Sequence, residues 1–172
     1  DRIDWLITTL LKISKLDAGT VSFNKETVSL ESLIKRSCSP LLIPIELRGQ
    51  ELIIRAEGDF YGDPAWTSEA VGNILKNCME HMPNGGRIEI EAAENALYSE
   101  IVIKDNGTGI SPKDLPHIFE RFYKGKDSDG KSFGIGLALS RMIIAGQKGT
   151  VKAENRKNAG AMFTLRFYKG TV

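Results

Sequence analysis

Segments with helical periodicity and segments with strand periodicity alternate along this chain, and this alternation restricts the possible fold more than any other feature. Residues 1–16 carry apolar side chains at spacings of three and four, from Ile3 to Ile13, as on one side of a helix that Gly19 would end. Further helical patterns lie at 30–39, 64–82 and 137–145, and strand patterns at 50–56, 87–92, 100–104, 150–154 and 161–168. We therefore predict an α/β (α+β) fold: a two-layer sandwich with a mixed, mostly antiparallel sheet of about five strands, about three helices on one face and an additional N-terminal helix.

The N-terminal helical pattern is wider than a surface helix of this length needs, because Ile7 and Leu11 extend its apolar stripe. It is either a helix that packs on its own domain or half of a helical hairpin, and the width favours the hairpin. The sequence also starts at Asp1, inside this pattern, without an initiating methionine or a signal peptide. We therefore expect the chain to be a piece of a longer protein, with any membrane anchor outside it.

Composition and charge exclude several classes of protein. The 23 basic and 22 acidic side chains of the 172 residues nearly cancel, whereas a nucleic-acid or membrane-surface binder needs a basic excess to attract phosphate. Hydrophobic residues make up 41% of the chain, which argues against disorder. Cys38 and Cys78 offer no CxxC pair and no zinc spacing, and therefore suit a reducing compartment. No apolar run approaches the roughly 20 residues that a membrane span needs.

A first glycine-rich turn follows a strand pattern and reads DNGTG at residues 105–109. An Asn-Gly pair between extended runs is a strong hairpin signal, but Ser111 and Pro112 are typical of a helix cap and a first helical position. We therefore expect the strand to lead into the turn and then into a helix. Glycine lets backbone approach a ligand closely, and the Asp105 carboxylate would accept a hydrogen bond from a donor such as an adenine amino group.

A second pair of glycines, Gly134 and Gly136, stands directly before a helical pattern. Free backbone N–H groups at such a helix start bind phosphate, and a flexible loop is the alternative. A dinucleotide-binding GxGxxG motif is excluded because its third glycine is replaced by Leu139. Residues 125–132 also match the P-loop pattern GxxxxGK[ST], but only 40 residues follow it, too few for the parallel sheet of that fold. We interpret this match as accidental.

Two asparagines lie in the helical pattern that Asp63 and Pro64 should open. Asn73 and Asn77 are four residues apart and therefore share one side of the helix. They stand beside apolar residues, where amide groups need partners. Because an amide oxygen suits Mg²⁺ that is held jointly with phosphates, this side of the helix is a candidate metal–phosphate surface.

These motifs, in this order, resemble those of the ATP-binding domain of sensor histidine kinases, within the Bergerat (GHKL) group. The resemblance rests on Asn73-x-x-x-Asn77 as the N box, 105–109 as the first glycine box, 119–124 (FERFYK) as the F box, 134–139 as the second glycine box, and 160–163 (GAMF) as the start of the last strand. Residues 10–19 (LLKISKLDAG) resemble the end of the dimerisation helix that precedes this domain. The resemblance implies that residues 1–19 are the end of the dimerisation and phosphotransfer helix and that 20–172 form the ATP-binding catalytic domain.

The resemblance also implies ATP and Mg²⁺ as cofactors and a role for each motif residue. Asn77 would bind Mg²⁺, Asp105 would accept the adenine amino group, and the catalytic residues would be Asn73, Arg121 and Lys124. The expected cofactor-binding residues are Asn73, Asn77, His81, Asp105, Gly107, Gly109, Ile110, Phe119, Phe122, Gly134, Ile135, Gly136 and Leu137. Residues from about 119 to 133 would form a lid over the phosphates. For Arg121 and Lys124 the alternative is a solvated loop charge, which is the preferred interpretation for Lys126 and Lys131.

Two features depart from the family pattern. Glu80 stands where many members carry Lys or Arg, and a carboxylate there would repel phosphate. Neither His81 nor His117 lies in the helix context of the family's phosphate acceptor, so we expect that acceptor upstream of Asp1.

The function that the resemblance implies is transfer of the γ-phosphoryl group of ATP to a histidine on an upstream helix. The partners would be the upstream dimerisation and phosphotransfer helices, a response-regulator receiver domain and a second copy in a homodimer, with no nucleic acid. The chain would belong to the cytoplasmic portion of a membrane-anchored bacterial sensor. Three alternatives stay open: a Bergerat-fold ATPase, which would need a general-base Glu in place of Asn73; a degenerate domain that only docks partners; and a P-loop NTPase.

Overall fold

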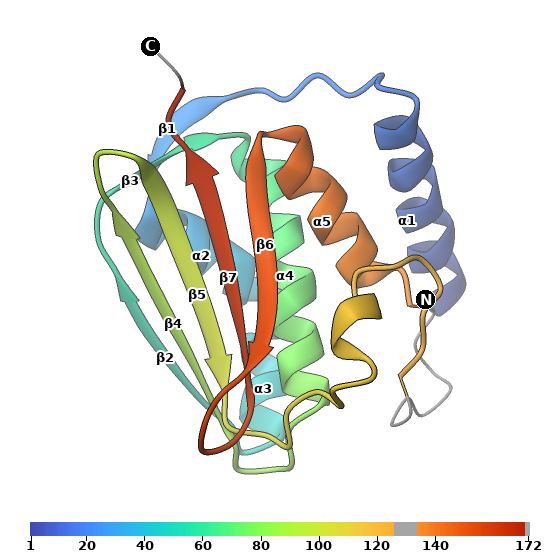
Figure 1. The fold of residues 1–172 in the computed structure, drawn as a ribbon, viewed down its shortest axis with the longest axis vertical. Coiled ribbons are helices and arrows are strands. Elements are labelled where there is room, and N and C mark those ends of the chain that lie inside the picture. Colours follow the sequence, from blue (N-terminus) through green and yellow to red (C-terminus); the bar gives the residue numbers. More distant parts are fainter. Residues whose placement is uncertain (126–133, 171–172) are drawn as a thin grey trace.

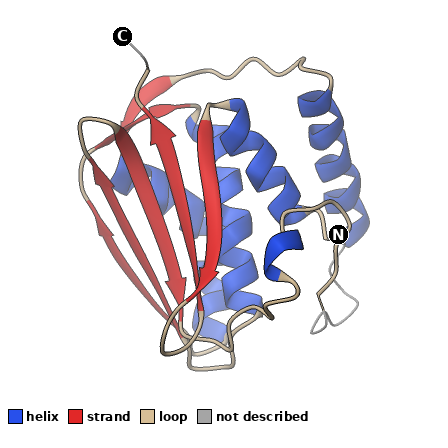
Figure 2. Cartoon of the chain, in the orientation of Figure 1, coloured by secondary structure: helices blue, strands red, loops and turns tan. Residues whose placement is uncertain are grey.

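A five-stranded sheet with helices on one face forms the body of the protein in a computed structural model, which describes residues 1–125 and 134–170 (Figures 1 and 2). The strand order is β2-β4-β5-β7-β6; β2 and β4 run parallel and the other neighbours antiparallel. The strands are β2 (Glu51–Ala56), β4 (Arg87–Glu94), β5 (Tyr98–Asp105), β6 (Gly149–Asn155) and β7 (Ala161–Tyr168). The predicted fold class is therefore confirmed.

Three helices cover one face of this sheet, and the N-terminal helix packs on the outside of the last of them (Figure 1). They are α2 (Leu30–Cys38), α4 (Pro64–Glu80) and α5 (Gly136–Gly146), and the N-terminal helix is α1 (Arg2–Asp17). Shorter elements are the 3-10 helices η1 (Ser39–Leu41) and η2 (Leu115–His117), α3 (Leu42–Leu47), and an antiparallel pair formed by β1 (Glu26–Ser29) and β3 (Asp59–Gly62). No helix in the described residues is both long and apolar enough to cross a membrane.

The core lies between the sheet and these helices. Because side chains alternate across a strand, every second residue of the central strands points to the helices. The fully buried side chains on β4, β5 and β7 include Ile88, Ile90, Ile101, Ile103, Phe163 and Leu165. They belong to one apolar cluster with Ile74 and Leu75 of α4, which are also fully buried. This packing fixes α4 against the middle of the sheet and so determines where the polar residues of α4 lie.

The start of α4 is fixed by the predicted cap. Asp63 Oδ1 accepts a hydrogen bond from Trp66 N at 3.0 Å, and its Oδ2 accepts one from Asn24 N at 2.8 Å. Asp63 N donates to Gln147 Oε1 at 2.7 Å, at the end of α5. An N-cap of this kind contributes about 1 kcal/mol, and here it also ties α4 to the end of α5.

The prediction of a helix after the first glycine-rich turn is wrong. Hydrogen bonds from Asp114 N and Leu115 N to Ser111 O form turns, and only the 3-10 helix η2 follows. Pro116 explains this, because proline has no N–H to donate and disfavours helical backbone in the preceding residue. Pro44 lies in the first turn of α3, where proline is tolerated, so a short helix follows the break that the sequence predicts. The short strand β3 was not predicted.

Candidate functional site

A cavity of about 780 Å³ lies where α4, the end of β5 and the start of α5 meet. The first turn of α1 and the segment from Gly109 to Gly125 also contribute to its lining. Ten of the predicted site residues line it: Asn73, Asn77, His81, Asp105, Gly109, Ile110, Lys124, Gly134, Gly136 and Leu137. Motifs that are up to 64 residues apart in sequence, from Asn73 to Leu137, are thus brought to one place.

Asp105 ends β5 and is 4% exposed, yet it lines the cavity. Its Oδ1 accepts hydrogen bonds from the backbone N of Gly107 and of Ala161, both at 3.0 Å. These two donors fix the orientation of the carboxylate. The Cys78 thiol beneath it is fully buried, and burial together with the negative charge of Asp105 raises the pKa of the thiol well above its usual range. A carboxylate held this way presents a fixed acceptor to a ligand that carries a hydrogen-bond donor.

Glycine is required at two positions of the cavity wall. Gly109 has φ +79°, and a Cβ there would lie 2.8 Å from Asn155 Oδ1. Gly134 has φ +69°, and a Cβ there would lie 2.5 Å from Tyr123 O. Both positions combine a left-handed backbone with a close approach of another chain segment, so no other residue fits without displacement.

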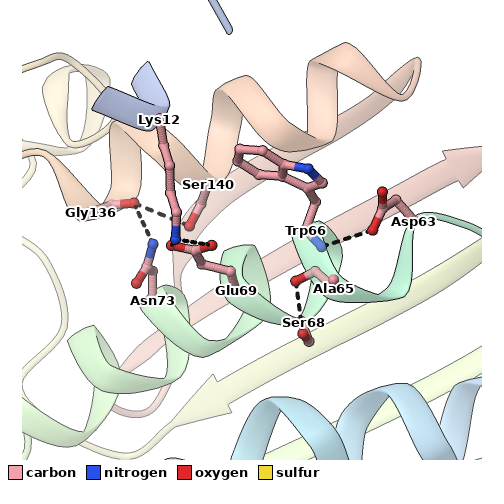
Figure 3. Close-up of polar contacts among 9 residues, drawn as sticks. All are labelled: Lys12, Asp63, Ala65, Trp66, Ser68, Glu69, Asn73, Gly136 and Ser140. Carbon is pink, nitrogen blue, oxygen red and sulfur yellow. Dashed lines mark hydrogen bonds and ion pairs between the residues drawn. The ribbon is translucent and has the colours of Figure 1, made fainter. Parts of the chain in front are cut away.

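Asn73 of α4 faces the start of α5. Asn73 Nδ2 donates to Gly136 O at 3.2 Å, and the same carbonyl lies 3.2 Å from Ser140 Oγ, as Figure 3 shows. The Asn73 amide is therefore oriented by the glycine turn. Asn77 lies one turn further along α4 and lines the same cavity. Among the described residues no group of three or more His, Cys, Asp or Glu side chains could hold a metal ion. The Asn77 amide oxygen is a ligand of the kind that Mg²⁺ shares with phosphate oxygens.

Several cavity residues were not predicted. Trp5 of α1 and Arg48 line the cavity through tertiary contacts that no local pattern signals, and Tyr123, which lies within the predicted F box, lines it as well. Lys76 could have been found, because it lies three residues after Asn73 on the same helix. Its Nζ lies 5.2 Å from the centroid of the Trp5 ring and 4.0 Å from Glu80 Oε1. A cation on α4 thus stands one turn before the unexpected carboxylate of Glu80.

A buried carboxylate, Asp114, holds the segment that precedes residues 126–133. Tyr123 Oη donates to Asp114 Oδ1 at 2.6 Å, and this bond raises the pKa of the Tyr123 phenol. Both residues line the cavity, as does the neighbouring Lys124. The segment before the undescribed residues 126–133 is therefore tied to the turn that follows Gly109. Lys126, Lys131 and most of the P-loop match fall within 126–133, outside the described residues.

Five predicted site residues do not line the cavity, and two of them support it from behind. Gly107 donates its N–H to Asp105, as described above. Ile135 is fully buried in the core directly before α5. These residues shape the backbone of the two glycine turns without facing the cavity.

The other three come from the predicted F box. Phe119 packs edge-on against Phe163, with ring centroids 6.3 Å apart, and Phe122 is 61% exposed. Arg121 points away to α1, where its Nη2 forms an ion pair with Asp17 Oδ1. The hydrogen bond between them lowers the pKa of Asp17 and raises that of Arg121. In this arrangement Arg121, the expected catalytic arginine, pairs with the N-terminal helix and does not reach into the cavity.

Known proteins resemble this chain in sequence. Residues 62–171 match the family described as histidine kinase-, DNA gyrase B- and HSP90-like ATPase. The chain is 30% identical over 179 residues to the sensor histidine kinase RppB of a Synechocystis strain, a match that covers 96% of this chain and 38% of RppB. It is 29% identical over 167 residues to the heme sensor protein HssS of Staphylococcus saprophyticus, covering 95% of this chain and 36% of HssS. The chain therefore spans well under half the length of these relatives.

Solved structures share the fold. A mycobacterial sensor histidine kinase, MprB, superposes with a TM-score of 0.74 at 24% identity, over 83% of this chain and 97% of that one. Full-length ShkA in complex with AMPPNP superposes with a TM-score of 0.83 at 19% identity, over 97% of this chain and 36% of that one. At these identities the likeness establishes the architecture and leaves the residue roles to the site itself.

Proposed function

Since the chain belongs to the family of histidine kinase-, DNA gyrase B- and HSP90-like ATPases, we propose that it is the ATP-binding catalytic part of a two-component sensor histidine kinase. The relatives named as sensor histidine kinases support this choice within the family. The observation that carries it is the convergence of Asp105, the α4 asparagines and the Gly134–Gly136 turn on one cavity. These are an acceptor, amide ligands and a helix start, which suit a base, a metal ion and phosphates respectively.

At the base end, Asp105 would accept a hydrogen bond from the adenine amino group. Its carboxylate is buried and already oriented by Gly107 and Ala161, so binding adenine costs little reorganisation. Guanine carries a carbonyl in place of that amino group and would set two acceptors against each other. The site therefore favours ATP over GTP.

At the phosphate end, Asn77 would hold Mg²⁺ through its amide oxygen together with phosphate oxygens. When bound, the metal would offset the charge of the phosphates. The backbone at Gly134–Leu137 lies at the positive end of α5, where anions are stabilised. Lys124 and Lys76 line the same cavity and would add positive charge, and Lys76 would offset the repulsion from Glu80. Arg121 would act there only after leaving Asp17.

The reaction would be phosphoryl transfer. An imidazole nitrogen of the acceptor histidine forms a bond to the γ-phosphorus while the bond from that phosphorus to the bridging oxygen breaks, and ADP leaves. Catalysis of this kind depends on positioning and charge stabilisation. Asn73 would orient the phosphate end through its bond to Gly136. Its amide cannot serve as a general base for water, so the site does not favour an ATPase of the gyrase type.

The remaining assignments follow from the same proposal. Residues 1–19 would be the end of the dimerisation and phosphotransfer helix, and 20–172 the catalytic domain. The partners would be the upstream helices with the acceptor histidine, a response-regulator receiver domain and a second copy of the protein. The chain would be the cytoplasmic portion of a membrane-anchored bacterial sensor.

Calorimetric titration with a non-hydrolysable ATP analogue in the presence of Mg²⁺ tests the binding step. We expect one site per chain, a clear preference over the corresponding GTP analogue, and weaker binding when Mg²⁺ is chelated. Radiolabelled ATP should transfer phosphate to a separately supplied acceptor helix pair but leave this chain unlabelled. Absence of adenine-nucleotide binding would instead favour a domain that only docks partners, and label on His81 or His117 would contradict the proposed acceptor.

A further inference from the structure

Two adjacent residues at the end of β6 contact the base end of the cavity from outside it. Asn155 Oδ1 accepts a hydrogen bond from Ile110 N, and Asn155 Nδ2 donates one to Ile110 O, both at 2.7 Å. One side chain thus satisfies both backbone groups of a cavity-lining residue that lies in no helix or strand. This paired bond fixes the backbone of Ile110 as a neighbouring strand would.

Arg156 contacts the other end of the same turn. Its Nη1 donates to Asp105 O at 2.8 Å, and its backbone N donates to Gly160 O at 2.9 Å. Gly160 lies so close under Asp105 that a Cβ on it would be 2.0 Å from Asp105 O. Ala161, the next residue, donates its N–H to Asp105 Oδ1. The connection between β6 and β7 therefore holds both the main chain and the carboxylate of Asp105.

We propose that Asn155 and Arg156 are positioning residues for base recognition, and that the β6–β7 connection sets the direction in which Asp105 presents its carboxylate. This inference rests on the proposed role of Asp105 in accepting the adenine amino group. Neither Asn155 nor Arg156 is among the residues that line the cavity, so each acts through Ile110 or Asp105. The connection determines how strongly the site distinguishes a purine with a 6-amino group from one without it.

The test is the ratio of two dissociation constants, for ATP and for purine riboside triphosphate, which lacks only the 6-amino group. If a variant is partly unfolded, the apparent affinities for both ligands fall by the same factor and their ratio is unchanged. The ratio therefore reports on base recognition and not on stability. The variants are Asn155→Ala, Arg156→Ala and Arg156→Lys. Their matched controls are Asn158→Ala and Lys157→Ala, because Asn158 and Lys157 are exposed residues of the same connection. Asp105→Asn reports on the proposed function itself.

We expect wild type and both control variants to bind ATP more tightly than purine riboside triphosphate, and by the same factor. Asn155→Ala and Arg156→Ala should each reduce that preference by about threefold or more, the worth of one hydrogen bond, and Arg156→Lys should restore part of it. If Asp105→Asn abolishes the preference while the Asn155 and Arg156 variants keep the wild-type ratio, the inference is overturned and the proposed function stands. If wild type binds both ligands equally tightly, Asp105 does not recognise the 6-amino group, and both the proposed role of Asp105 and this inference are wrong.

Discussion

The two ends of the cavity are built differently. At the base end, Asp105 is 4% exposed, and its carboxylate accepts hydrogen bonds from the backbone N–H groups of Gly107, in the turn after β5, and of Ala161, the first residue of β7. At the phosphate end, the side chains of Lys76 and Arg121 are 49% and 44% exposed and are paired with exposed carboxylates, Lys76 with Glu80 and Arg121 with Asp17. A buried, bonded group is oriented before the ligand arrives, whereas an exposed cation must exchange one partner for another. We therefore expect base recognition to be set by the fold itself, and phosphate contacts to depend on which carboxylates the exposed cations are paired with.

The sharpest test of this difference is Asp105→Asn, and it carries the largest expected effect. The amide can keep its oxygen toward Gly107 and Ala161 only by turning its NH₂ toward the adenine amino group, so two donors would face each other. A lost hydrogen bond to a charged group corresponds to about 10-fold to 100-fold in affinity, and we expect the upper end. Calorimetry with an ATP analogue measures it.

Asp59→Asn is the matched control, because Asp59 is exposed on β3 and does not line the cavity. Circular dichroism on both variants checks that the fold is retained. Equal affinities for Asp105→Asn and wild type would show that the preorganised carboxylate is not the base acceptor.

The second prediction concerns Asn77, the proposed Mg²⁺ ligand at the phosphate end. Asn77→Ala should weaken ATP-analogue binding by about 10-fold in Mg²⁺ and have little effect when Mg²⁺ is chelated, since it removes one oxygen ligand of the metal. Titrations with and without chelator measure the difference. Asn84→Ala, in the exposed turn after α4, should behave as wild type. A loss of the same size in both conditions would mean that Asn77 acts without the metal.

The difference between the two ends of the cavity also explains which parts of the site could be predicted from the sequence. Asp105, Asn73 and Asn77 stand in local patterns, a strand end with glycines and a helix face, so their grouping was foreseeable. The fold followed from the same periodicities. Trp5 and Arg121 could not be placed, because their positions depend on how α1 packs on α5, and residues far apart in sequence decide that. The helix expected after Ser111 was wrong because Pro116 outweighs a good cap.

The third prediction compares two neighbouring side chains of opposite charge at the phosphate end, Lys76 and Glu80. Lys76→Ala should weaken ATP binding by about threefold at low salt, and Glu80→Gln should strengthen it by a similar factor. AMP, which lacks the outer phosphates, should be nearly unaffected by either. Both effects should fade in 1 M salt, because exposed charges are screened. If Glu80→Gln leaves ATP binding unchanged at low salt, the carboxylate does not face the phosphates.

The smallest expected effect is that of releasing Arg121 from α1. Asp17→Asn removes the ion-pair partner and should strengthen ATP binding by less than about twofold, because the pair is exposed. In an Arg121→Ala background the same substitution should have no effect, since the two changes act through one contact. An equal gain in both backgrounds would show that Asp17 influences the cavity by another route.

The ion pair between Asp17 and Arg121 also has a predictable pH dependence. Arg121 lowers the pKa of Asp17 below its ordinary value of 3.8 in the folded protein. A carboxyl with a lowered folded pKa stabilises the fold above its unfolded pKa, and this contribution is lost as the pH falls through the folded pKa. Wild type should therefore be slightly more stable than Asp17→Asn at pH 6, and the difference should shrink as the pH falls below 3.8 and vanish below the folded pKa of Asp17. Thermal unfolding of both proteins across this range measures it. A difference that persists at the acidic end would mean that Asp17 stabilises the end of α1 by something other than its charge.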